Sequence, residues 1–137
     1  MRNIFWSMTL VVACLFGAAT AQAQKQVTTN NAIVPGEVWN DTDGNPINAH
    51  GGGILYHEGT YYWYGEYKKG KTILPEWATW ECYRTDVTGV SCYSSKDLLN
   101  WKFEGIVLPA VKDDQGHDLH TSKVLERPKV IYNPKTK

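Results

Sequence analysis

The sequence predicts an all-β domain, and three observations support this prediction. Apolar β-forming residues come in short runs between turn residues, and stretches with the period of a helix are scarce. Aromatic residues are frequent, with six tryptophans and eight tyrosines in 137 residues. The segment YYWYGE (residues 61–66) carries aromatic side chains on both faces of a strand. Such a strand must be covered on both sides, as in sheets stacked face to face around an axis.

Turn signals divide the chain into short strands of similar length. Four are predicted, at residues 51–56, 61–66, 90–95 and 101–108. The first two form a hairpin in which Gly59 takes a positive φ. Three consecutive glycines open the first strand, so its backbone must pass close to another strand or to a ligand. One helical turn, capped by Ser94 or Ser95 and pointing Leu98 and Leu99 inward, is predicted before the fourth strand.

A weak internal repeat suggests how these strands are arranged. An apolar strand, a tyrosine and a polar turn follow Gly53 and recur after Pro128, an offset of about 75 residues. Repeats on this scale indicate β-propeller blades, so the four strands would form the first blade. The second blade would only begin, as a strand that runs into a turn opened by Asn133. A strand without its return partner indicates a chain cut within its fold.

The N-terminus has the pattern of a secretory signal peptide. Arg2 precedes an apolar run, which is short for a transmembrane span, and an A-x-A cleavage site ends at Ala23. An alternative interpretation is a lipoprotein box in which Cys14 is acylated. We expect a secreted or periplasmic protein with a signal peptide at 1–23, a linker at 24–32 and a folded part at 33–137.

The charge balance excludes some partners. The chain has 14 basic and 14 acidic side chains, and removing the signal peptide takes away only Arg2. Nucleic acid and anionic membranes require basic patches, so neither is expected as a partner. Export permits a disulfide between Cys82 and Cys92, which flank a candidate hairpin turn at 85–89; two small buried residues are the alternative.

Three stretches carry a resemblance to a known family: NAHGGGILYHEGTYYWYGE, GVSCYSSKDLLNW and LERPKVIYNPKTK. Together they resemble the start of the glycoside hydrolase family 43 catalytic domain, a five-bladed β-propeller. The combination of A-H-G-G-G, Y-Y-W-Y-G-E and E-R-P-K resembles the exo-β-1,3-galactanase branch. The similarity extends over about residues 34–137, which is only the first part of such a domain.

The resemblance implies an enzyme that releases galactose from the non-reducing end of β-1,3-galactan with inversion. Inversion requires an acid that protonates the leaving oxygen and a base that activates water on the opposite side. Most of the family has a base aspartate early in the first blade, but residues 49–52 contain none. The galactanase branch also lacks this aspartate. The general acid is expected beyond Lys137, so no catalytic residue is assigned within this chain.

Four residues are predicted to bind substrate. By motif, Glu66 and Glu126 correspond to carboxylates that contact the terminal galactose in the galactanase branch. His50 precedes the three glycines and is a candidate hydrogen-bond partner, and Tyr64 is a candidate aromatic contact. Each has a structural alternative: a solvated rim for Glu66, an ion pair with Arg127 for Glu126, a channel histidine for His50 and core packing for Tyr64.

The remaining expectations concern metals, partners and rival functions. His117, Asp118 and His120 resemble a metal cluster, but a polar loop explains them, so no metal or cofactor is expected and nothing supports a structural calcium ion. Trp77 and Trp80 are candidates for a sugar subsite. The expected partner is a polysaccharide or oligosaccharide, and the full-length protein is expected to be a monomer. The rival functions are an α-L-arabinofuranosidase or β-xylosidase of the same family, and a non-catalytic carbohydrate-binding propeller.

Overall fold

The computed structural model describes residues 27–73 and 84–137. The predicted signal peptide, Cys82 and the loop tryptophans Trp77 and Trp80 lie outside this part. The described residues form strands and no helix, so the all-β prediction is confirmed. They also contain no helix that is long and apolar enough to cross a membrane.

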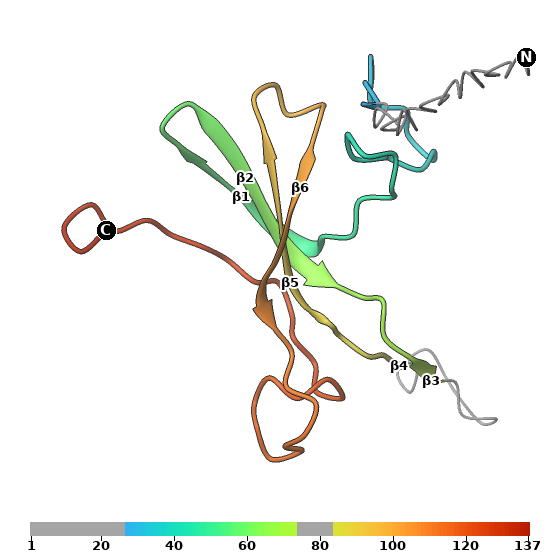
Figure 1. Cartoon of the computed structure of the whole chain (residues 1–137), viewed down its shortest axis with the longest axis vertical. Helices are drawn as coiled ribbons and strands as arrows, with labels where there is room; N and C mark the ends of the chain where they lie inside the picture. The colour runs from blue at the N-terminus through green and yellow to red at the C-terminus, as the bar shows by residue number, and fades with distance from the viewer. Residues whose placement is uncertain (1–26, 74–83) are drawn as a thin grey trace, which may run out of the picture.

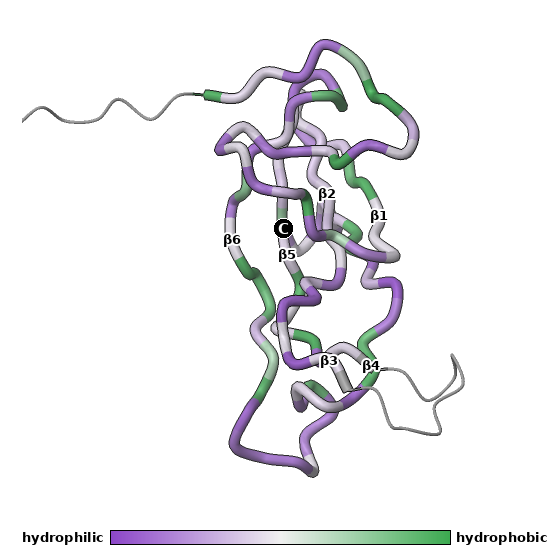
Figure 2. The backbone as a smooth tube through the Cα atoms, turned by 90° about the vertical axis from the view of Figure 1, so that its right-hand side faces the viewer, coloured by the Kyte–Doolittle hydropathy of each residue, from purple (hydrophilic) through white to green (hydrophobic). Residues whose placement is uncertain are grey.

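Four antiparallel strands form the main sheet, in the order β1-β2-β5-β6 (Figure 1). They are β1 (His50–His57), β2 (Thr60–Tyr67), β5 (Gly89–Ser95) and β6 (Lys102–Pro109). Each lies within one residue of its predicted bounds at both ends. Figure 2 shows hydrophobic stretches on the edge strands β1 and β6, with the paler, aromatic β2 between them. A second, two-stranded sheet pairs β3 (Thr72–Ile73) with β4 (Arg84–Thr85).

The hairpin between β1 and β2 has the tight turn that its sequence predicts. Glu58 and Gly59 both have positive φ, 47° and 74°. Two positive φ values in a two-residue loop are typical of a type I′ turn, whose twist matches that of the flanking strands. The turn sets a register in which Ile54 pairs with Trp63 and Tyr56 with Tyr61.

An aromatic core lies on the face of the sheet that carries Trp63. The Trp63 ring contacts Trp101 at 5.3 Å and Trp39 at 5.8 Å between centroids. Trp101 is 1% exposed and Tyr93 2% exposed, so both are structural. Trp39 comes from the segment before β1, and its indole donates to the Leu99 carbonyl at 3.0 Å. The segment before β1 therefore packs on this face of the sheet.

The predicted helical turn after β5 is wrong. Ser95 does accept a hydrogen bond from the Leu98 amide at 2.9 Å, as a cap would. However, Leu98 has a φ of 62° and its side chain is exposed rather than inward. Asp97 accepts hydrogen bonds from the next amides, those of Leu99 and Asn100. These side-chain hydrogen bonds stabilise a tight turn in place of a helix.

Two other local predictions also differ from the structure. Residues 85–89 are not a hairpin turn, because the strands on either side of them, β4 and β5, do not pair: β4 pairs with β3. The segment after Pro128 forms no strand; only its turn is present, where the Lys135 amide donates to the Asn133 side chain at 2.9 Å. The backbone bends at Arg127, with a φ of 51°, and the segment lies beside β1 without joining its ladder.

Candidate functional site

Glu66 is the most constrained acidic side chain of the predicted site. It lies near the end of β2, is 3% exposed, and pairs in register with His50 of β1. Its Oε1 accepts a hydrogen bond from the Arg127 amide at 2.9 Å. The Lys68 Nζ lies 2.8 Å from Oε2, but within the described chain that oxygen accepts no hydrogen bond of good geometry. Glu66 is therefore an ion-paired carboxylate with unused hydrogen-bonding capacity, not a solvated rim residue.

The three glycines of β1 make room for this carboxylate and its neighbours. Gly51 has a φ of 55°, and a Cβ there would lie 3.1 Å from the Glu66 Oε1 and 3.3 Å from the Arg127 Cγ. A Cβ on Gly52 would lie 2.8 Å from the Trp63 indole nitrogen, and it would also clash with the backbone of β2. The predicted close approach is confirmed: the neighbours are the adjacent strand and the segment around Arg127.

The chain places the backbone of Glu126 near Glu66. It directly precedes Arg127, whose amide binds the Glu66 carboxylate. Glu126 is exposed, and within the described residues it forms no ion pair with Arg127. Its contact with substrate stays a prediction. The far end of the same segment contacts β1 again, where the Tyr132 and His57 rings lie 4.1 Å apart.

His50 pairs in register with Glu66 and also lines a hollow on the Trp63 face of the sheet. The hollow is lined by Val38, Trp39, Ile47, Ala49, His50 and Trp63. His50 is exposed, and no hydrogen bond holds its ring within the described chain. Its role in hydrogen-bonding a sugar stays a prediction.

Tyr64 shares the Glu66 face of β2 but has a packing partner. Burial and then the neighbouring Cys92 thiol, to which it is hydrogen-bonded, raise the pKa of Tyr64 to about 12. Burial likewise raises the pKa of the Cys92 thiol, which is free. The contact favours a packing role for the tyrosine; a contact with substrate stays a prediction, and the proposed partner Cys82 lies outside the described residues.

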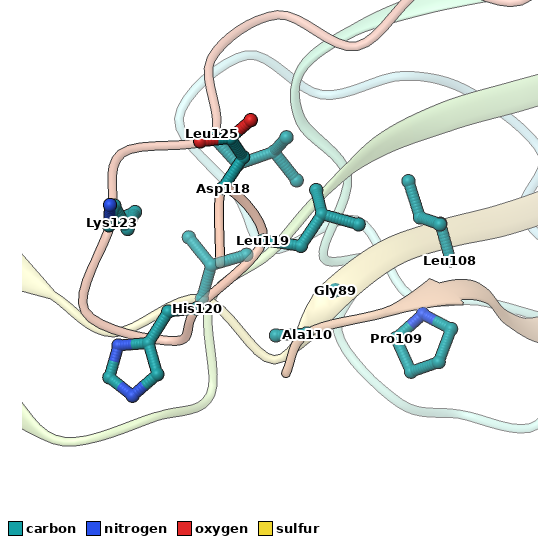
Figure 3. A pocket seen from close by; sticks show the side chains of 10 residues that line it. Gly89, Leu108, Pro109, Ala110, Asp118, Leu119, His120, Lys123 and Leu125 are labelled. Carbon is teal, nitrogen blue, oxygen red and sulfur yellow. The ribbon is translucent and has the colours of Figure 1, made fainter. Parts of the chain in front are cut away.

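The loop that carries His117, Asp118 and His120 forms a separate hollow at the end of β6 (Figure 3). Its walls are mostly apolar, including Leu108 and Leu119. The His120 Nδ1 lies 2.8 Å from the Ser122 hydroxyl. In the part of the chain that the structure describes, no three acidic, histidine or cysteine side chains are grouped to hold a metal ion.

Sequence reasoning missed two lysines: Lys68, which pairs with Glu66, and Lys129, which contacts the backbone of β1 and Arg127. Lys68 follows Glu66 by two residues, a spacing that places both side chains on one face of an extended chain, and this signal was available. The sequence shows Lys129 only as part of the E-R-P-K motif, because its contacts depend on how the segment after Glu126 returns to β1.

Searches against family models and curated proteins find no match. Solved structures do match. A family 43 β-1,3-galactosidase with galactodeoxynojirimycin is 53% identical, with a TM-score of 0.60, over 76% of this chain and 27% of that one. The described residues are similar in fold and sequence to part of glycoside hydrolase family 43 enzymes.

Two further family 43 matches act on the same type of linkage according to their names. An exo-β-1,3-galactanase from Phanerochaete chrysosporium with galactose is 41% identical, with a TM-score of 0.60, over 76% of this chain and 21% of that one. An exo-β-1,3-galactanase from Clostridium thermocellum is 43% identical, with a TM-score of 0.52, over 76% and 19%. This chain thus spans about a quarter or less of the structures it matches.

Proposed function

We propose that the full-length protein is an exo-acting, inverting β-1,3-galactosidase that acts on plant galactan. One observation carries this proposal: the buried carboxylate of Glu66, near the end of an aromatic strand, accepts a hydrogen bond from the Arg127 amide, and Glu126 directly precedes Arg127. The sheet that contains this strand is similar to part of the β-1,3-galactanase structures. Carboxylates make strong, directional hydrogen bonds to hydroxyl groups. The pair is therefore suited to hold the hydroxyls of a terminal galactose.

In this proposal the residues of this chain bind and orient the sugar. Glu66 uses one oxygen for the Arg127 amide and keeps capacity on the other, beside the Lys68 ammonium. The flexible lysine can share that oxygen with a sugar hydroxyl or move aside. Proton transfer to the leaving oxygen requires a carboxylic acid on the other side of the bond, which we expect beyond Lys137.

The first test is hydrolysis by the full-length protein. We expect it to release galactose from β-1,3-galactobiose, and nuclear magnetic resonance to detect α-galactose first, because inversion of a β-linkage gives the α-anomer. Arabinofuranosides and xylosides serve as competing substrates. Faster cleavage of either would favour the rival enzymes, and galactose binding without hydrolysis would favour a carbohydrate-binding propeller.

A further inference from the structure

Lys129 has an unusual set of partners for a surface lysine. Its Nζ lies 3.1 Å from the carbonyl oxygens of both Gly51 and Gly52, and 3.4 Å from that of Arg127. An ammonium group has three donors, so these three carbonyls account for all of them. Within the described residues Lys129 has no carboxylate partner. Its charge therefore serves the backbone rather than an ion pair.

These carbonyls belong to an irregular part of β1. The register with β2 shifts between His50 and Gly53, and the two glycines in between are those that Lys129 contacts. Bulges leave backbone groups outside the ladder, and such groups need other partners. The Lys129 ammonium, which comes from the segment that follows Glu126, donates to these two carbonyls.

Gly53 is the position that admits this lysine. A Cβ at Gly53 would lie 2.7 Å from the Lys129 Cδ and 3.4 Å from its Cε. The aliphatic part of Lys129 thus crosses β1 over a residue that has no side chain. Because the nearest neighbour is a flexible side chain and not backbone, an added methyl group would displace the lysine rather than the strand.

Lys129 and Glu66 hold the same short turn from two sides. Glu66 binds the Arg127 amide, and Lys129 binds the Arg127 carbonyl. Arg127 has a φ of 51°, a conformation that costs about 1–2 kcal/mol for a residue with a side chain. The turn therefore depends on contacts that hold it, and it carries Glu126 immediately before Arg127.

We propose that Lys129 is a positioning residue. Its side chain, which crosses β1 in the space left by Gly53, fixes the turn at 126–129 against β1 and so determines the position of Glu126 relative to Glu66. The inference rests on the proposed function, because it assigns the two carboxylates to one galactose. It assigns Lys129 no contact with the sugar.

The test replaces Lys129 by methionine in the full-length protein, which keeps the aliphatic stem and removes the ammonium. We expect galactose affinity, measured by calorimetry, to fall about tenfold, and KM to rise more than kcat falls, since ground-state binding is lost. The Arg127 amide should exchange its hydrogen several-fold faster. Lys135→Met is the matched control, because that side chain makes no described contact.

Gly53→Ala provides an independent route to the same change. It should reproduce the effects of Lys129→Met, and the double variant should be no worse than either single variant, because both remove one contact. An unchanged rate of hydrogen exchange at the Arg127 amide in both variants would overturn the proposal. If the unaltered protein binds galactose, unchanged galactose affinity in the variants would also overturn it. If the unaltered protein binds no galactose, the proposed function fails, and Arg127 exchange alone then decides whether Lys129 holds the turn.

Discussion

At the scale of single residues, the site depends on how one buried carboxylate is satisfied. A carboxylate that is 3% exposed is costly to bury unless it is ion-paired and hydrogen-bonded. Glu66 has both kinds of partner, the Lys68 ammonium and the Arg127 amide. The same contacts fix its orientation, which a residue that binds a sugar hydroxyl requires.

Two substitutions at Glu66 should separate its binding role from its structural role. Glu66→Gln keeps an oxygen for the Arg127 amide but loses the charge, so galactose affinity should fall by about 1.5–3 kcal/mol, roughly 10- to 150-fold. Glu66→Ala also leaves the Arg127 amide without a partner and should lower the melting temperature as well. Calorimetry and thermal melts measure the two effects. Glu104→Gln, on β6, is the control, and equal galactose affinity in the Glu66→Gln variant and the unaltered protein would contradict the binding role.

The four main strands and the tight turn between β1 and β2 could be predicted from the sequence, but the turn between β5 and β6 and the path of the chain after Glu126 could not. The strands follow from short apolar runs between glycine and turn residues, signals that act within a few residues. The turn after β5 differs from the predicted helical turn because the Asp97 side chain accepts hydrogen bonds from the amides that follow it and Leu98 takes a positive φ, which apolar spacing does not reveal. Glu66 and Glu126 were found by motif, whereas Lys129 depends on a contact across more than seventy residues.

At the scale of elements, the turn between β5 and β6 should respond to acid. The Asn100 amide, with contributions from its side chain and from the Leu99 amide, holds the pKa of Asp97 well below its ordinary value. A carboxylate with a lowered folded-state pKa stabilises the fold above its unfolded pKa, near 4, and this stabilisation is lost as the pH falls further. Asp97→Ala should therefore lower the melting temperature at pH 7, and the difference should shrink below about pH 4. The same difference at both pH values would contradict a role for the ionised form, and Asp113→Ala is the exposed control.

At the scale of the whole molecule, the described part leaves apolar surface uncovered on both edges of its sheet. On β1, Ile54 is 54% exposed and Tyr56 is 61% exposed. On β6, Val107 is 53% exposed, and beyond the sheet Ile131 is 90% exposed. Propeller blades bury such faces against neighbouring blades, and each repeat depends on its neighbours for a continuous core. The one described blade therefore has a core on the Trp63 face and open edges elsewhere.

This distribution predicts how residues 24–137 behave in isolation. Expressed alone, they should bind a hydrophobic dye, melt without a sharp transition and show no galactosidase activity, because one blade cannot close a propeller and its open edges favour association. The full-length protein should bind little dye and melt cooperatively. Differential scanning calorimetry and dye fluorescence on both proteins make the comparison. A sharp, reversible melt of the isolated segment would mean that the Trp63 core stabilises a blade by itself, and packing between blades would then be unnecessary for folding of this part.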